Sequence, residues 1–316
     1  MMVVLDLDLS LVKNSNKTSL NGKKGLIIYS GQSRFFDECI ELQSKATENF
    51  KRYTGLIDKN FKLDIMLSTW KEDTPEDHMD SLNKWTHGEV FSRLIENNVF
   101  DELIKYNPNI KNYNGVRAML GKIHALCHVF DLPSHYDFFI LTRTDYHVPC
   151  IDINDAKFLN TRMNDACDNI TSLFSAGHFF KVDRWSIMID DNYAIVPPDL
   201  IYPLDRNNTE NVGLSVMRAI VKEQEFSAHV ILLKFLSELQ KACHAYYSET
   251  DIEKKITFQK KNALRFLTYH KPVKFIRSLE VLNALLLDYS DETWFGTTAG
   301  KSKGSNYPYR IIKKTE

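Results

Sequence analysis

Three apolar runs of strand character end abruptly in polar residues, and this pattern limits the possible folds more than any other feature of the chain. The strands are predicted over Leu26–Tyr29, Leu63–Leu67 and Phe138–Leu141. The polar segments that follow them are Ser30–Arg34, Ser68–Lys71 and Arg143–His147. In open α/β sheets, ligands bind at the carboxyl ends of the strands. If these strands are parallel neighbours, their polar ends converge on one crevice.

The third polar segment carries the residue types that bind charged ligands. Alternation along an extended chain places Arg143, Asp145 and His147 on one face. A fixed cation, a carboxylate and an imidazole suit a diphosphate and a divalent cation such as Mn²⁺ or Mg²⁺. We therefore consider Arg143 and Asp145 as ligand-binding candidates, with Asp145 and His147 as candidate metal ligands. An ordinary strand end with a solvated ion pair is the alternative.

A glycine-containing turn follows the first strand and precedes a predicted helix. Free backbone N–H groups and the dipole of a helix N-terminus, together with the guanidinium of Arg34, would hold a phosphate. Ser30 and Gly31 belong to this turn, and an exposed arginine at a helix start is the alternative interpretation. Trp70 and Lys122 complete the set of ligand-binding candidates.

A pair of acidic residues, Asp190 and Asp191, follows another short apolar run. Either carboxylate could act as a general base or as a metal ligand. A turn with two solvated acids explains the same pattern. We take both residues as catalytic candidates.

The composition excludes several classes of protein. The chain has 316 residues, of which 43% are hydrophobic and 26% charged, values that indicate a globular protein. Lys plus Arg (40) nearly balances Asp plus Glu (41), so the net charge of −1 gives no global argument for nucleic-acid binding. The five cysteines are scattered without a C-x-x-C pair, which favours reduced thiols in a cytosol-like compartment.

Neither a membrane span nor a signal peptide is expected. No apolar run approaches the roughly 20 residues that span a bilayer. Asp6 and Asp8 interrupt the apolar stretch at the amino terminus, which is not typical of a signal peptide. We therefore expect a soluble cytoplasmic protein without an integral membrane segment.

Strand and helix patterns alternate along most of the chain. Further strands are predicted over Val3–Leu9, Ser186–Ile189 and Tyr193–Val196. Helices are predicted over Phe35–Tyr53, residues 86–106, Gly115–Phe130 and most of Ser215–His270, with an acidic loop over Asp73–Asp80. This order favours an α/β fold of Rossmann-like type, in which helices flank a mostly parallel sheet, followed by a helical C-terminal addition. We place the boundary between a ligand-binding domain, 1–205, and a helical region with a basic tail, 206–316.

Three segments resemble a family, in the same order along the chain. They are Ile27–Phe36, Asp64–Trp70 and Tyr136–Asp145. These segments resemble the patterns hydrophobic-Ser-Gly-Gln-x-Arg-x-Phe, Asp-x-Phe-x-x-Thr-Trp and Tyr-Asp-x-x-x-x-x-Arg-x-Asp of a group of viral and bacterial glycosyltransferase-like proteins. Val182–Leu200 resembles the later Asp-Asp segment of that group. The similarity spans roughly residues 25 to 205. The shared order of the segments is stronger evidence than any single motif.

The resemblance implies a GT-A fold, in which an Asp-containing motif after a central strand holds a metal and the diphosphate of a donor such as a UDP- or GDP-sugar. By this resemblance Arg34 would contact the donor, Asp145 would occupy the metal position, and Asp190 or Asp191 would face the sugar or the acceptor. Arg143 stands where the first acid of Asp-x-Asp is usual, so it could neutralise the phosphates itself. The resemblance implies a glycosyltransferase. If the protein is viral, as some members of the group are, we expect it in the host cytoplasm.

The acceptor would be a hydroxyl of a glycan or of a modified base in phage DNA, and we expect residues 206–316 to recognise it. Two other functions remain open. Asp6 and Asp8 imitate the first motif of haloacid-dehalogenase-type phosphatases, although the spacing to Ser30 is too short for the intervening helix. A non-catalytic protein that binds nucleotide sugars would keep the crevice without turnover.

Overall fold

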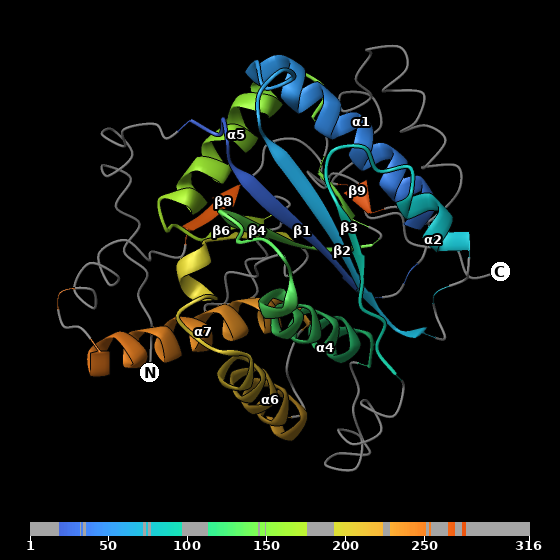
Figure 1. Cartoon of the computed structure of the whole chain (residues 1–316). Helices are drawn as coiled ribbons and strands as arrows, with labels where there is room; N and C mark the ends of the chain where they lie inside the picture. The colour runs from blue at the N-terminus through green and yellow to red at the C-terminus, as the bar shows by residue number, and fades with distance from the viewer. Residues whose placement is uncertain are drawn as a thin grey trace, which may run out of the picture.

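The chain folds around one central sheet that lies between two layers of helices (Figure 1). The computed structural model describes residues 19–31, 33, 36–71, 74, 77–96, 113–144, 146–148, 150–175, 193–223, 228–250, 253, 265–268 and 274–275. The predicted strands over Val3–Leu9 and Ser186–Ile189 lie outside the described residues.

The sheet is mixed but mostly parallel. Its strands are β1 (Lys24–Gly31), β2 (Lys62–Thr69), β3 (Val90–Ser92), β4 (Phe138–Arg143), β6 (Ser172–Ser175), β7 (Tyr193–Val196) and β8 (Arg265–Thr268). Within the described residues, these seven strands pair in the order β3-β2-β1-β4-β7-β6-β8. Only β7 runs antiparallel to its neighbours in this sheet. Two short strands, β5 (Tyr146–His147) and β9 (Lys274–Phe275), form a separate pair.

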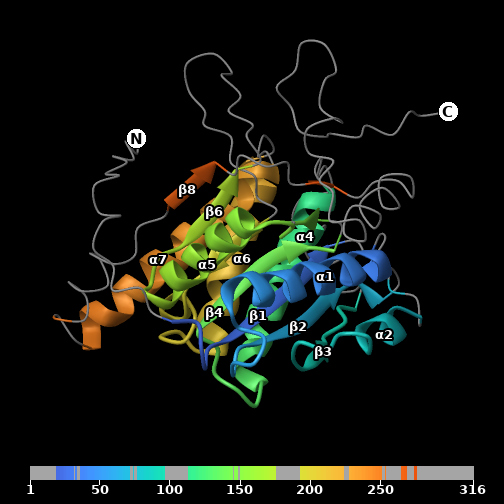
Figure 2. The same ribbon diagram turned by 90° about the horizontal axis from the view of Figure 1, so that it is seen from above.

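Helices cover both faces of the sheet, as Figures 1 and 2 show from two directions. The described helices are α1 (Phe36–Thr54), α2 (Asp77–Leu82), α4 (Tyr113–His128), α5 (Ile153–Cys167), α6 (Arg206–Glu223) and α7 (Ala228–Thr250), with 3₁₀ turns at Val129–Asp131 and Pro198–Leu200. Helices α1 and α5 pack on one face, and α4, α6 and α7 on the other.

Strand β1 shows why the sheet needs cover on both sides. Leu26 and Ile28 face the core that contains α4, whereas Ile27 and Tyr29 face the core beneath α1 and α5. All four side chains are at most 1% exposed. A strand that is buried on both faces has a continuous apolar sequence, and this pattern predicted β1. The prediction of an α/β fold with a mostly parallel sheet flanked by helices is confirmed.

The helices of the C-terminal region share a core with the sheet. Met217 of α6 and Phe235 of α7 are fully buried in the same cluster as Ile28 of β1. Strand β8 follows both helices and pairs in parallel with β6. The division at residue 205 into two domains stays a prediction, but the described residues on its two sides are packed together.

Two local predictions are wrong within the described residues, and one strand was not predicted. In place of the helix predicted over 86–106, strand β3 pairs with the edge of β2, because this edge offers backbone partners that outweigh a helical apolar pattern. Strand β8 occupies part of the region predicted as helical up to His270. The loop predicted over Asp73–Asp80 contains the start of α2, since acidic residues at its first turn suit a helix N-terminus as well as a loop.

Candidate functional site

The predicted strand ends meet at one edge of the sheet. Ser30 of β1 pairs with Ser68 of β2 on one side and with Arg143 of β4 on the other, and Gly31 pairs with Thr69. All three strands are parallel, so these residues lie at the carboxyl edge (Figure 1). Neighbouring strands are about 4.8 Å apart, which places the three ends within about 10 Å of one another. This edge is the crevice position expected for a ligand.

Gly31 allows the chain to leave this edge towards α1. Its φ of 104° lies in the left-handed region that side chains disfavour. Helix α1 begins five residues later at Phe36, and its first turn carries Asp37 and Glu38. These carboxylates oppose a phosphate at the helix N-terminus, so an anionic ligand there would depend on nearby cations. The predicted cation Arg34 lies outside the described residues.

Hydroxyl groups fix the strand ends to the surrounding framework. Ser30 Oγ donates to the carbonyl of Thr142 at 3.3 Å, and Ser68 Oγ donates to the carbonyl of Gly121 at 2.9 Å. Thr69 and Thr74 hydroxyls lie 2.6 Å apart. Ser30, Ser68 and Thr69 have no exposed surface. Their role in this arrangement is therefore to hold the edge in shape.

Helix α4 lies unusually close to this edge. An added Cβ at Gly121 would lie 2.9 Å from the carbonyl oxygen of Ser68 and 3.0 Å from Cβ of Ser30. Only glycine permits this approach without a backbone shift. The next residue, Lys122, is a predicted ligand-binding cation and is buried at 2% exposure.

Trp70 lies beneath the site. It has no exposed surface, packs in the core with Met66 and Ile95, and forms a parallel bridge with Ile95. The predicted contact between Trp70 and a ligand stays a prediction. In this structure the fully covered side chain supports the strand end from below.

The remaining predicted residues are distributed as follows. Arg143 ends β4 and is partly exposed. His147 lies in β5, whose backbone pairs it with Lys274. Arg34, Asp145, Asp190 and Asp191, with Asp6 and Asp8 of the alternative phosphatase motif, lie outside the described residues.

No metal centre is formed by the described side chains alone. Among them, no group of three or more His, Cys, Asp or Glu could hold an ion. The predicted metal ligand Asp145 is not among these side chains, so the Mn²⁺ or Mg²⁺ site stays a prediction.

His124 is a residue of this region that the sequence reasoning missed. Its Nδ1 lies 3.0 Å from Ser68 Oγ, and its ring contacts that of His128 with centroids 4.5 Å apart. His128 in turn pairs with Asp131 at 2.9 Å, and Asp131 with Arg206 at 3.2 Å.

Burial chiefly, and then the charges of His128 and Arg206, lower the pKa of His124 to about 4. The imidazole is therefore neutral at pH 7. Nδ1 of the neutral His124 ring shares a hydrogen bond with Ser68 Oγ, whose direction depends on the tautomer. The sequence signals for this contact are a serine at the end of a predicted strand and a histidine three residues after a glycine on a predicted helix. None of the motifs considered above includes His124.

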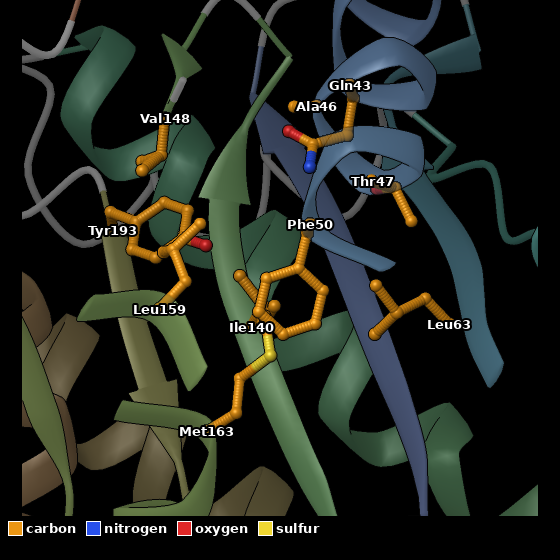
Figure 3. Close-up of a pocket in the computed structure, with 10 residues that line it drawn as sticks. All are labelled: Gln43, Ala46, Thr47, Phe50, Leu63, Ile140, Val148, Leu159, Met163 and Tyr193. Atoms are coloured by element: carbon orange, nitrogen blue, oxygen red, sulfur yellow. The ribbon is translucent and has the colours of Figure 1, made fainter. Parts of the chain in front are cut away.

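A small cavity lies between the sheet and helices α1 and α5 (Figure 3). Phe50, Ile140, Leu159 and Met163 point into it, and its volume is about 20 Å³. That volume suits one water molecule and excludes a sugar or a nucleotide. This cavity is therefore not the ligand site.

Comparisons with known proteins give structural similarities only. No family model matches the chain, and no curated protein matches its sequence. Among solved structures, it is similar to a 4-diphosphocytidyl-2C-methyl-D-erythritol synthase from Anaerococcus prevotii, with 12% identity over 85% of this chain and 97% of that one and a TM-score of 0.39.

It is also similar to the mannosyltransferase Ktr4p from S. cerevisiae, with 9% identity, 71% and 70% coverage and a TM-score of 0.40. For mouse xyloside xylosyltransferase 1 the values are 8%, 85% and 92%, and 0.38. We base no functional argument on similarities at these TM-scores. Among the described helices, none is both long and apolar enough to cross a membrane.

Proposed function

We propose that the chain is a glycosyltransferase that moves a sugar from a nucleotide-sugar donor to a hydroxyl acceptor, and that it belongs to the group of viral and bacterial proteins it resembles. The observation that carries the proposal is the meeting of Ser30–Gly31, Ser68–Thr69 and Arg143 at one carboxyl edge. These are the segments that carry the family resemblance. A diphosphate-linked sugar fits the combination of a glycine turn, a helix N-terminus and fixed cations.

Transfer of the sugar requires positive charge near the leaving diphosphate. A sugar that departs from a diphosphate leaves negative charge behind, and cations already in place stabilise it without reorganisation. Arg143 at the end of β4 and Arg34 would supply that charge. A metal held by Asp145 and His147, when bound, would supply more.

A carboxylate could deprotonate the acceptor hydroxyl in an inverting reaction. Asp190 and Asp191 would fill this role. Both precede β7 in the chain, and β7 begins at Tyr193, which pairs with Thr142 beside Arg143. The entry of β7 at the carboxyl edge supports a place for the two acids on the acceptor side of the same site, with a glycan or a modified DNA base as acceptor.

The test is release of nucleotide from UDP- and GDP-sugars by the full chain, with and without Mn²⁺. Arg143→Ala is expected to lower the rate about 100-fold, the typical effect of removing one group that stabilises developing charge. Asp145→Ala should also lower it. Arg52→Ala, which removes an exposed arginine from the last turn of α1, is the matched control and should leave the rate unchanged.

Thermal shifts with the same nucleotide sugars separate an enzyme from a binding protein. Donor-specific stabilisation without any nucleotide release would favour the non-catalytic binder. Full activity of Arg143→Ala, together with unchanged donor affinity, would refute the placement of the diphosphate at this edge.

A further inference from the structure

A second hollow opens at the opposite edge of the sheet. It has a volume of about 370 Å³ and lies between the end of α1, the turn that precedes β2, and the loop of residues 86–89. Strand β2 rises about 3.3 Å per residue from Lys62 to Thr69, so the hollow lies roughly 20 Å from the carboxyl edge. It is therefore separate from the proposed donor site, and its size lies within the range of ligand pockets.

Three lysines from different elements line this hollow, which we name the lysine hollow. Lys51 lies in the last turn of α1, Lys59 in the turn before β2, and Lys62 is the first residue of β2. In the described part of the chain, none of the three pairs with a carboxylate, whereas Lys45 on α1 pairs with Glu41. Burial lowers the pKa of Lys51.

Among the described lining residues, Glu89 has the one carboxylate, and it lies 3.8 Å from Nζ of Lys24. Among the described lining residues, the three ammonium groups therefore outnumber the one carboxylate. Lysine ammonium groups bind phosphates as point charges, and three of them around one space repel one another until an anion enters.

The wall opposite the lysines is held rigidly. The amide of Leu63 donates to the carbonyl of His87 at 3.1 Å, and Nε2 of His87 lies 3.1 Å from Ser44 on α1. An added Cβ at Gly88 would lie 2.3 Å from the carbonyl oxygen of Leu63, so only glycine allows the loop to pack here. Burial, followed by the charge of Lys51, lowers the pKa of His87.

We propose that the lysine hollow is a binding site for an anionic group of phosphate type, distinct from the donor site. The amide of Asn60 and the hydroxyl of Thr86 supply neutral hydrogen-bond donors around the three ammonium groups, and Phe61 forms a buried apolar side. The ligand is a small anion or a phosphorylated sugar that fits about 370 Å³. The proposal stands independently of the transferase activity.

Lysine acetylation followed by mass spectrometry tests this site in the full chain. Saturating inorganic pyrophosphate is expected to protect Lys51, Lys59 and Lys62 at least about threefold, as charge-paired ammonium groups react slowly. Lys45, on the same helix but outside the hollow, is the internal control. Protection of Lys51, Lys59 and Lys62 no greater than that of Lys45 would overturn the proposal.

A double variant, Lys59→Gln with Lys62→Gln, checks the same site by affinity. Both side chains are exposed, so the fold should be kept. Pyrophosphate needed to protect Lys51 is expected to rise at least about tenfold, which corresponds to the loss of one charge-assisted contact. The control, Lys45→Gln, should leave it unchanged. Repeating the titration with inorganic phosphate and with a sugar monophosphate identifies the source: a lower half-protecting concentration for the sugar monophosphate indicates a phosphorylated sugar, and a higher one a free anion. An unchanged half-protecting concentration in the double variant would overturn the site.

Discussion

The two edges of the sheet differ in the kind of polar group that they bury. At the amino edge, the carboxylate of Asp64 has no exposed surface and accepts from Lys24 Nζ at 2.8 Å, Tyr136 Oη at 2.9 Å and the Glu89 amide at 2.8 Å. At the carboxyl edge, the buried groups of Ser30 and Ser68 are neutral hydroxyls.

The contrast separates a structural charge from a candidate functional one. The partners of Asp64 leave no room for a ligand, so its charge serves to bind β2 to β1 and to the segments that precede β3 and β4. At the carboxyl edge the hydroxyls fix the backbone, and the charge of Arg143 lies at a partly exposed strand end. A fully partnered buried ion is costly to disturb.

The motifs that carry the family resemblance contain both kinds of residue. Asp64 begins the second motif and Tyr136 the third, and the two side chains contact each other. The ends of the same motifs, at Trp70 and Asp145, lead to the carboxyl edge. Similarity to the patterns therefore reports on the folding of the sheet as much as on the site.

The largest expected effect is on stability at the amino edge. Asp64→Ala would leave Lys24 and Tyr136 without their buried partner and should lower the free energy of unfolding by about 3–5 kcal/mol in urea titrations. Ser68→Ala, at the other edge, should cost only about 1 kcal/mol. Asp58→Ala removes an exposed carboxylate and serves as the control. Equal losses for Asp64→Ala and Ser68→Ala would remove the contrast between the edges.

A second, smaller effect is expected where α4 touches the carboxyl edge. In Gly121→Ala the new methyl group would press on the carbonyl of Ser68, and the forced shift should cost about 1–3 kcal/mol despite the better helix propensity of alanine. Donor binding should weaken as well, because the strand ends at Ser30 and Ser68 would be displaced. Unfolding curves and donor titrations measure both. A variant with unchanged stability and donor affinity would mean that the close approach is irrelevant to the site.

The smallest expected effect is a pH dependence that belongs to the carboxyl edge. The pKa of His124 is lowered from 6.5 to about 4, so the unfolded chain binds the proton more readily than the folded one. The associated stability is present above pH 6.5 and is lost as the pH falls towards 4. The loss should be about 1–2 kcal/mol for a partly exposed ring.

His124→Gln should remove this part of the pH dependence, and unfolding at pH 7 and pH 5 measures it. His135→Gln, which changes an exposed ring on the loop before β4, is the control. An equal fall in stability for the wild type and His124→Gln would place the titrating group elsewhere.

The parallel core of the fold could be predicted because its strands are buried on both faces. Leu26–Tyr29, Leu63–Leu67 and Phe138–Leu141 all lie within observed strands, and the helix predicted over Phe35–Tyr53 differs from α1 by one residue at each end. The edge strands β3 and β8 were misread because their short segments are defined by a neighbour's backbone and not by their own apolar pattern.

Two elements between residues 150 and 176 went unpredicted. Helix α5 begins with a capping box in which Asp152 accepts from the amide of Asp155 and the Asp155 side chain accepts from the amide of Asp152. The Asp-x-x-Asp spacing was a usable local signal. Strand β6 is four residues long, and its place beside β7 is set by the sheet.

For the site, the sequence could predict which segments meet but not the burial of individual side chains. Alternation and strand order brought Ser30, Ser68 and Arg143 together. The sequence could not show that Trp70 is fully covered, because its cover depends on Ile95 from a separate segment. The contact between His124 and Ser68 depends in the same way on the close approach of α4.

The common core of the sheet and helices α6 and α7 has a practical consequence for anyone who shortens the chain. A fragment that stops at residue 205 would strip the cover from the sheet face that holds Ile28 and leave partners of Met217 and Phe235 in water. Such a product should aggregate on expression. Crystallisation or activity trials would therefore need to retain at least α7, even if only the donor-binding half were wanted.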